Sequence, residues 1–89
     1  MNIELYSGPF CAYCVMAKQL LKRMGLNYRE YNVRADSAKL EEMLSRSGGA
    51  RTIPQVFING RHVGGYDDLS ALFRSGKLSD WLENDNKQA

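Results

Sequence analysis

The spacing of apolar residues limits the folds available to this chain of 89 residues more than any other feature. Along the chain it changes between a strand-like and a helical pattern. In its first half, short strand-like runs at 3–6 and 28–33 alternate with helical patterns that end at Met24 and begin at Asp36 or Ser37. Two strands separated by a helix are usually parallel neighbours joined by a right-handed crossover. We therefore expect the first half to form a strand, a helix, a parallel strand and a second helix.

The second half of the chain has a different pattern. Apolar runs at 55–58 and 61–63 flank Asn59-Gly60, a dipeptide typical of a tight hairpin turn. Three further segments follow: a third helix over 67–76, a short last helix over 78–82, and a frayed polar tail from residue 83. The hairpin added to the parallel pair predicts an α/β fold, a mixed four-stranded sheet flanked by helices, formed by one domain over residues 1–89.

Size and charge exclude several classes of function. A chain of this length can bury the modest core of one compact domain. The formal net charge of +2 is too small to predict a polyanion-binding surface, so we expect no nucleic-acid partner. The first residues lack the basic start and apolar stretch of a signal peptide, and no later run is long enough to span a bilayer. We therefore expect a cytoplasmic protein without a membrane partner.

The only two cysteines, Cys11 and Cys14, lie where the first strand gives way to the first helix. A cysteine at the first turn of a helix faces unpaired backbone N–H groups and the positive end of the helix dipole, which favour the thiolate. The spacing brings the second sulfur within one helical turn of the first, so the pair can close and reopen a disulfide. We therefore expect Cys11 to be the nucleophile and Cys14, on the core side, to be the resolving thiol.

Two other interpretations of the cysteine pair, a zinc half-site and a structural disulfide, fit the sequence less well. A tetrahedral zinc site needs four ligands, and beyond the two sulfurs the chain offers only His62, on the predicted hairpin. A disulfide that closes so short a loop removes little entropy from the unfolded chain, and structural disulfides are rare in a reducing compartment. We therefore expect redox chemistry and no metal site.

Three motifs occur in order along the chain: Cys11-Ala12-Tyr13-Cys14 at a helix start, Thr52-Ile53-Pro54 before a strand, and Gly64-Gly65-Tyr66-Asp67-Asp68 at a later helix start. Together with the order of elements they resemble a dithiol glutaredoxin of the thioredoxin fold, over nearly the whole chain. The resemblance implies a glutathione-dependent oxidoreductase that reduces protein–glutathione mixed disulfides and protein disulfides, in electron transport and cell redox homeostasis. It implies catalysis by Cys11 and Cys14, with glutathione bound at Tyr13, Thr52, Ile53, Pro54, Gly65, Tyr66 and Asp67.

The resemblance gives these residues roles that suit their chemistry. It implies a cis peptide bond at Pro54, and a backbone pairing between Ile53 and the cysteinyl part of glutathione like that of an added strand. The glycines before Asp67 permit close backbone approach, the helix start offers N–H groups to a carboxylate, and Asp67 can accept from an ammonium group. Simpler interpretations stay open: Ile53 as a core residue, Asp67 as a helix cap, and Tyr13 as an exposed aromatic residue.

Two positions depart from the family pattern. Glutaredoxins commonly carry Lys or Arg three residues before the first cysteine, which holds the glycyl carboxylate of glutathione and favours the thiolate, whereas this chain has Gly8 there. The candidates to replace that charge are Arg51, Lys39 and Lys18. Ala12 stands where many dithiol glutaredoxins have proline. In the family, small residues there are associated with dimers that bridge a [2Fe-2S] cluster through the first cysteine, here Cys11, and bound glutathione.

Two alternatives to a glutathione-dependent enzyme stay open at this point. One is a thioredoxin-reductase-dependent redoxin, against which Tyr13 and Gly65-Tyr66-Asp67 argue, and the other is a carrier of a glutathione-ligated [2Fe-2S] cluster. Glutathione is expected as a co-substrate. The expected protein partners are glutathionylated or disulfide-containing proteins, with ribonucleotide reductase among the candidates, and without a cluster we expect a monomer.

Overall fold

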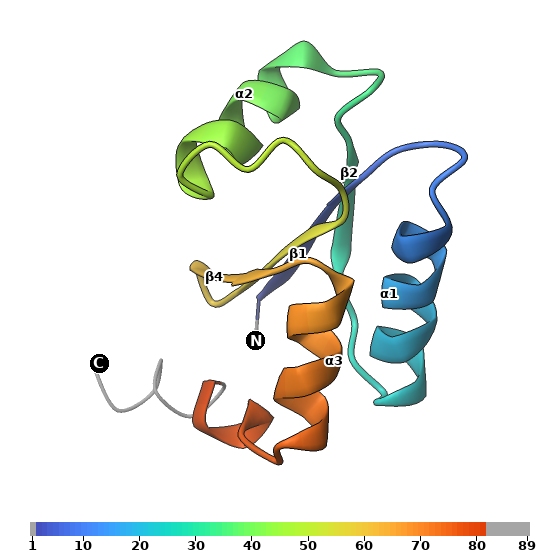
Figure 1. Cartoon of the computed structure of the whole chain (residues 1–89), viewed down its shortest axis with the longest axis vertical. Helices are drawn as coiled ribbons and strands as arrows, with labels where there is room; N and C mark the ends of the chain where they lie inside the picture. Colours follow the sequence, from blue (N-terminus) through green and yellow to red (C-terminus); the bar gives the residue numbers. More distant parts are fainter. Residues whose placement is uncertain (1, 82–89) are drawn as a thin grey trace.

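The computed structural model describes residues 2–81 and arranges them as a mixed four-stranded sheet with helices on both faces (Figure 1). In chain order the elements are β1 (Ile3–Ser7), α1 (Ala12–Arg23), β2 (Arg29–Asn32), α2 (Ser37–Arg46), β3 (Gln55–Ile58), β4 (Arg61–Gly64) and α3 (Tyr66–Arg74). The strand order is β2-β1-β3-β4, in which β1 runs parallel to β2 and antiparallel to β3. The predicted fold class is confirmed.

Some element ends differ from the prediction. β2 covers less than the predicted 28–33, because its pairing with β1 ends where Ser7 meets Asn32. α3 begins at Tyr66, directly after the hairpin, rather than at Asp67. Strand pairing sets the ends of β2, and the position of the hairpin sets the start of α3. The spacing of apolar residues alone does not predict either boundary.

The C-terminal part continues past α3 with a helical turn over residues 78–81, as predicted. The predicted extension of this turn to Leu82, and the tail from residue 83, lie outside the described residues. None of the helices within residues 2–81 combines the length and the apolar character needed to cross a membrane.

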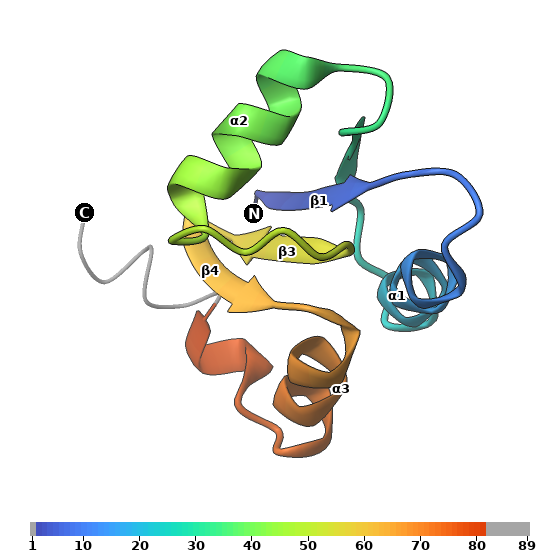
Figure 2. The same cartoon turned by 45° about the horizontal axis from the view of Figure 1, so that its top comes forward.

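Each face of the sheet carries its own hydrophobic layer, because successive side chains of a strand point to opposite faces. One layer lies against α1 and α3, and its buried residues are Ile3, Leu5, Ala17, Leu21, Val56, Ile58 and Leu69. The other lies against α2, and its buried residues are Tyr6, Val33, Met43 and Phe57. Figure 2 shows α2 on one side of the strands and α1 and α3 on the other.

The hairpin between β3 and β4 has the geometry that its sequence predicts. Asn59 and Gly60 both have positive φ, 51° and 82°. A two-residue hairpin turn needs positive φ at both positions if its twist is to match that of the flanking strands. The hairpin therefore sets the direction of β4, and with it the place where α3 begins.

A hydrogen-bonded network fastens α2 to the sheet. The Tyr6 hydroxyl donates to the Glu42 carboxylate and accepts from Arg46 Nη1 at 2.6 Å, while Arg46 Nη2 donates to Glu4 Oε1 at 2.9 Å. Burial, reinforced by the hydrogen bond to Glu42, raises the pKa of Tyr6 to about 12. That hydrogen bond also lowers the pKa of Glu42. Polar contacts therefore supplement the apolar layer beneath α2.

Candidate active site

The strand directions bring the three motifs to one edge of the sheet. β1 and β4 are both antiparallel to β3, so α1 and α3, which follow them, begin at the same edge (Figure 1). β3 itself starts at that edge, directly after Thr52-Ile53-Pro54. Segments that are far apart in the sequence therefore meet beside the cysteine pair.

Cys11 ends the loop after β1 and caps α1. Its backbone is extended, with φ −122° and ψ 102°, and its carbonyl accepts from the Val15 N–H at 3.1 Å. The Cys11 Sγ accepts a hydrogen bond from the backbone N–H of Cys14 at 3.1 Å. The first turn of α1 contains no acidic side chain that would oppose a thiolate. The start of α1 therefore favours negative charge on the Cys11 sulfur.

The two cysteines differ in exposure and are joined by a disulfide. Cys11 is half-buried, whereas Cys14 is only 1% exposed. Their Cα atoms are 5.2 Å apart, within the usual range for a disulfide. A substrate can therefore approach the first sulfur from solvent but not the second, which suits the predicted division into nucleophile and resolving thiol.

The peptide bond between Ile53 and Pro54 is cis, as the resemblance implies. The Ile53 carbonyl oxygen lies 3.8 Å from Cys11 Sγ. At the same time the Ile53 side chain packs against the hydrophobic layer beneath α2. The core interpretation of Ile53 is therefore confirmed, and it is compatible with the predicted glutathione pairing because the Ile53 backbone lies beside the Cys11 sulfur.

A cavity of about 510 Å³ opens beside the cysteine pair. All the residues predicted to bind glutathione line it: Tyr13, Thr52, Ile53, Pro54, Gly65, Tyr66 and Asp67. The rings of Tyr13 and Tyr66, with centroids 6.1 Å apart, connect the starts of α1 and α3 along its wall. The fold therefore brings the predicted residues together, and their binding roles stay predictions.

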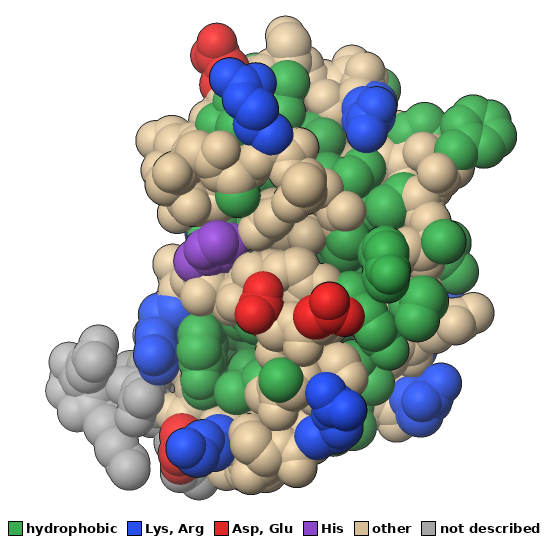
Figure 3. Space-filling view, in the orientation of Figure 1, with side chains coloured by type: hydrophobic (Ala, Val, Ile, Leu, Met, Phe, Trp, Pro, Cys, Tyr) green, Lys and Arg blue, Asp and Glu red, His purple; other side chains and the backbone are tan. Residues whose placement is uncertain are grey.

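Two neighbouring carboxylates at the start of α3 have different surroundings. Asp68 Oδ2 accepts a hydrogen bond from the Gly65 N–H at 3.1 Å and so caps the helix. Asp67 is exposed and accepts no hydrogen bond from residues 2–81. Figure 3 shows acidic side chains together over the start of α3. The capping role considered for Asp67 therefore belongs to Asp68, which leaves Asp67 available to a ligand.

Known proteins resemble the chain over nearly all of its length. A family model described as glutaredoxin matches residues 3–63. Glutaredoxin 3 of Escherichia coli is 44% identical over 82 residues, which cover 92% of this chain and 98% of that protein. The chain belongs to the glutaredoxin family. It is a glutathione-dependent thiol–disulfide oxidoreductase, as its motifs predict.

Solved glutaredoxin structures share the fold. A glutaredoxin from Brucella melitensis is 44% identical with a TM-score of 0.75, covering 90% of this chain and 86% of that one. A buckwheat glutaredoxin–glutathione complex is 31% identical with a TM-score of 0.81, covering 93% of this chain and 77% of that one. This glutaredoxin therefore has the predicted thioredoxin fold.

A second cavity of this glutaredoxin, of about 400 Å³, adjoins the first, and Tyr13, Thr52 and Ile53 line both. Its other lining residues are Pro9, Phe10, Cys11, Ala12, Arg34 and Arg51. Sequence reasoning selected neither Phe10 nor Arg34. Because β2 is parallel to β1, the residues after β2 also reach the edge of the sheet that carries Cys11. The position of Arg34 after a predicted parallel strand was the signal that could have found it.

Gln55 and His62 also line the first cavity and were not among the predicted site residues. The Gln55 Nε2 donates to the Thr52 carbonyl oxygen at 2.9 Å, and its Oε1 lies 2.7 Å from His62 Nε2. Gln55 thereby supports the segment that carries the cis-proline. In the sequence, the signal for Gln55 is a polar residue at the start of an apolar strand. In the structure that residue is only 4% exposed, which is unusual for a polar side chain.

Residues 2–81 give little support for metal ligation by this glutaredoxin alone. Residues 2–81 contain no group of three or more His, Cys, Asp or Glu side chains that could hold a metal ion. His62 is engaged elsewhere, since it pairs with Gln55 and stacks on Phe57 with ring centroids 4.9 Å apart. The zinc half-site considered from the sequence therefore lacks a full ligand set within the described part of the chain, and a [2Fe-2S] cluster would need ligands beyond Cys11 and Cys14.

Proposed function

We propose that this glutaredoxin removes glutathione from proteins with Cys11 alone and reduces protein disulfides with Cys11 and Cys14 together. The observation that carries the proposal is the contrast between the two sulfurs. Cys11 is half-buried at a helix start and accepts the Cys14 N–H at 3.1 Å, whereas Cys14 is 1% exposed. Only the first sulfur can meet a bulky substrate, and only the second lies close enough to resolve the product.

Deglutathionylation requires one cysteine. The Cys11 thiolate attacks the glutathione sulfur of the mixed disulfide, a new S–S bond forms between Cys11 and glutathione, and the protein leaves as a thiolate that takes a proton from water. A second glutathione thiolate then attacks the glutathione sulfur on Cys11. Oxidised glutathione leaves and the Cys11 thiolate is regenerated.

Reduction of a protein disulfide requires both cysteines. The Cys11 thiolate attacks one sulfur of the disulfide and releases the other as a thiolate. Cys14, deprotonated, then attacks the Cys11 sulfur, which releases the second protein thiolate and closes the Cys11–Cys14 disulfide that the structure contains. Two glutathione molecules reduce that disulfide and leave as oxidised glutathione.

The first cavity supports a position for glutathione. Pairing of its cysteinyl backbone with Ile53 places its sulfur beside Cys11, whose Sγ lies 3.8 Å from the Ile53 carbonyl oxygen. The ammonium group of the γ-glutamyl end then reaches Asp67, and its carboxylate meets the N–H groups at the start of α3. Tyr13 and Tyr66 flank the peptide.

Replacing each cysteine by serine tests the proposal. Cys14→Ser should keep most of the deglutathionylation rate but lose protein-disulfide reduction by about tenfold or more, because nothing resolves the mixed disulfide. Cys11→Ser should lose both activities, because the nucleophile is gone. The measurement is glutathione-coupled turnover on a glutathionylated peptide and on a protein disulfide. Equal loss of both activities in Cys14→Ser would contradict the division of roles.

The proposal also covers the location, the oligomeric state and the client proteins of this glutaredoxin. We place the protein in the cytoplasm as a monomer, with glutathionylated and disulfide-containing proteins as clients. Ribonucleotide reductase is one disulfide-containing client to assay, by its turnover with this protein and glutathione as the only reductant. Cell fractionation and sedimentation test the location and the oligomeric state.

Apart from the small residue Ala12, no observation on residues 2–81 favours either alternative function. Turnover with glutathione and glutathione reductase should exceed turnover with thioredoxin reductase; the opposite preference would overturn the glutathione assignment. Purification without oxygen and with glutathione should give a colourless monomer. A brown dimer under those conditions would instead support cluster binding.

A further inference from the structure

Arg34 packs directly over Gly8, three residues before Cys11. A Cβ atom built on Gly8 would lie 2.7 Å from Arg34 Cγ, 3.0 Å from Ile53 Cδ1 and 3.5 Å from Arg34 Nε. Because Cβ atoms essentially never approach other atoms within 3.0 Å, the missing side chain at Gly8 is what allows Arg34 to lie there. The Arg34 side chain occupies the space where a side chain from position 8 would begin.

The two cavities beside Cys11 differ in charge. The first is lined by the carboxylates of Asp67 and Asp68 and by no Lys or Arg, whereas the second is lined by Arg34 and Arg51 and by no carboxylate. Glutathione has an ammonium and a carboxylate group at its γ-glutamyl end but only a carboxylate at its glycyl end. Charge complementarity therefore favours the γ-glutamyl end in the first cavity and the glycyl end in the second.

Two of the cations considered from the sequence are already paired. Lys18 Nζ lies 3.0 Å from a Glu30 carboxylate oxygen, and Lys39 Nζ lies 3.3 Å from Glu42 Oε2. Neither lysine lines either of the two cavities beside Cys11. A ligand carboxylate would have to displace an existing partner to reach them.

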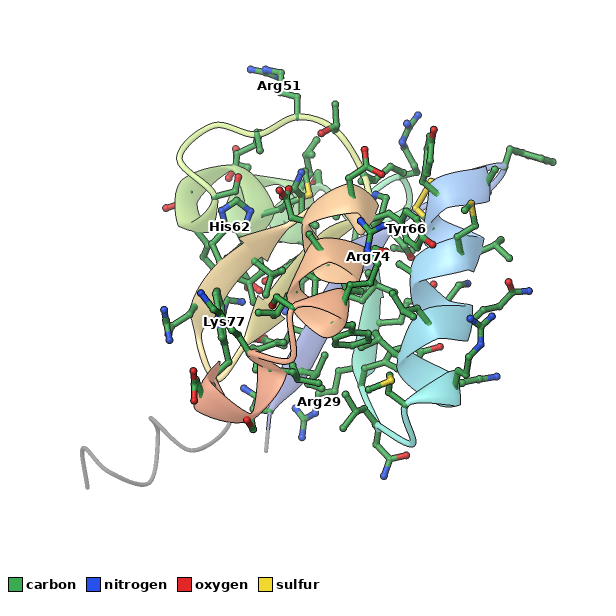
Figure 4. All side chains as sticks on the ribbon, turned by 60° about the horizontal axis from the view of Figure 1, so that its bottom comes forward. Arg29, Arg51, His62, Tyr66, Arg74 and Lys77 are labelled. Carbon is green, nitrogen blue, oxygen red and sulfur yellow. A yellow bond between two sulfur atoms is a disulfide. The ribbon has the colours of Figure 1, made fainter. Side chains whose placement is uncertain are left out.

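The two arginines of the second cavity are not equivalent. Figure 4 shows the Arg51 side chain pointing into solvent, away from the start of α1. Arg34 instead lies against Gly8 and lines the cavity that contains Cys11. Among residues 2–81, no carboxylate forms an ion pair with the Arg34 guanidinium. Arg34 is therefore the cation best placed to meet an anionic group beside Cys11.

We propose that Arg34 binds the glycyl carboxylate of the glutathione that reacts at Cys11, and so determines the specificity for a free carboxylate at that end. The inference rests on the proposed function. A planar guanidinium can donate two parallel N–H groups to a carboxylate but gains much less from a neutral amide. Arg34 comes from the segment after β2 and lies beside Cys11. It supplies there the positive charge that a side chain at position 8 would otherwise supply.

Moving the positive charge from position 34 to position 8 tests the proposal. The substrates are a glutathionylated peptide and its analogue with the glycyl carboxylate converted to an amide. Arg34→Ala should raise KM for the first substrate about fivefold, a modest change because the site is exposed, and leave KM for the amide nearly unchanged. Gly8→Lys alone should not lower KM, because its Cβ meets Arg34 Cγ. The double variant Gly8→Lys/Arg34→Ala should restore most of the affinity.

Three comparisons keep the outcomes distinct. Arg29→Ala removes the same charge at the opposite end of the molecule (Figure 4) and should leave KM unchanged. Arg51→Ala should raise KM less than Arg34→Ala, and a larger rise would overturn the assignment to Arg34. Equal KM values for Arg34→Ala and wild type, or an equal rise with both substrates, would also overturn it. If the wild-type protein has no glutathione-coupled turnover, the proposed function itself fails.

Discussion

Cys11 is the nucleophile in the proposed mechanism, and the groups that favour its thiolate are backbone groups rather than neighbouring side chains. The N–H of Cys14 points at its sulfur from 3.1 Å, and the first turn of α1 lacks acidic residues. Because these groups belong to the helix itself, they form whenever α1 forms. A side chain can still oppose them, and Ala12 is the exposed position next to the sulfur from which it can do so.

A charge introduced at Ala12 should therefore change the titration of Cys11. In wild type, the alkylation rate of reduced Cys11 should reach half its maximum below the pH of about 8.5 expected for a free cysteine. Ala12→Glu should move that midpoint upward by about half a unit, because a carboxylate repels the thiolate. Ala12→Gln is the neutral control of the same size. A wild-type midpoint equal to that of free cysteine would contradict the helix-start account.

At the scale of elements, α2 is held to the sheet by the hydroxyl of Tyr6 as well as by apolar packing. Tyr6 lies on β1, and its partners Glu42 and Arg46 lie on α2. The pKa of Tyr6 is raised from 10.0 to about 12, so the folded protein holds this proton more tightly than the unfolded chain. The resulting stability is present below pH 10 and is lost as the pH rises from 10 to 12.

The alkaline stability of α2 should therefore depend on one hydroxyl. Tyr6→Phe should lower the free energy of unfolding by about 1–3 kcal/mol at neutral pH, because Glu42 and Arg46 lose a buried partner. Between pH 10 and 12 the variant should lose less stability than wild type. Urea unfolding at several pH values measures both effects. Tyr28→Phe is the matched control, and parallel pH curves for Tyr6→Phe and wild type would contradict the prediction.

For the whole molecule, the main structural fact is that one sheet separates two hydrophobic layers. Met43 belongs to the layer under α2, whereas Trp81 packs against the opposite layer, which holds Leu21. The sheet connects them, because residues of β1 and β3 contribute to both faces. We therefore expect the two layers to unfold together as one cooperative unit.

Trp81 fluorescence can report on this coupling from the far side of the sheet. Met43→Ala should lower the free energy of unfolding by about 2–5 kcal/mol, because Met43 is fully buried, and should shift the Trp81 transition and the far-UV circular dichroism transition equally. Met24→Ala, at a residue that is 47% exposed, should change stability by less than about 0.5 kcal/mol. Two separate transitions would show that the layers are independent.

Local signals account for the parts of the structure that were predicted correctly. Asn59-Gly60 specifies the hairpin because both positions need positive φ, and Asp36 caps α2 through hydrogen bonds to N–H groups two and three residues on. The site residues around Pro54 and Asp67 came from resemblance to a family rather than from local physics. Their meeting at one edge follows from strand directions, which the order of elements already implied.

The helices and strands, the hairpin and the cysteine at a helix start were predictable because each depends on residues a few positions apart. The folded structure was needed to show that Arg34, rather than Arg51, Lys39 or Lys18, lies over Gly8. The two cases differ in how far apart along the chain the contacting residues lie. Contacts within one turn follow from local spacing, whereas the approach of Arg34 to Gly8 depends on the packing of the whole sheet edge.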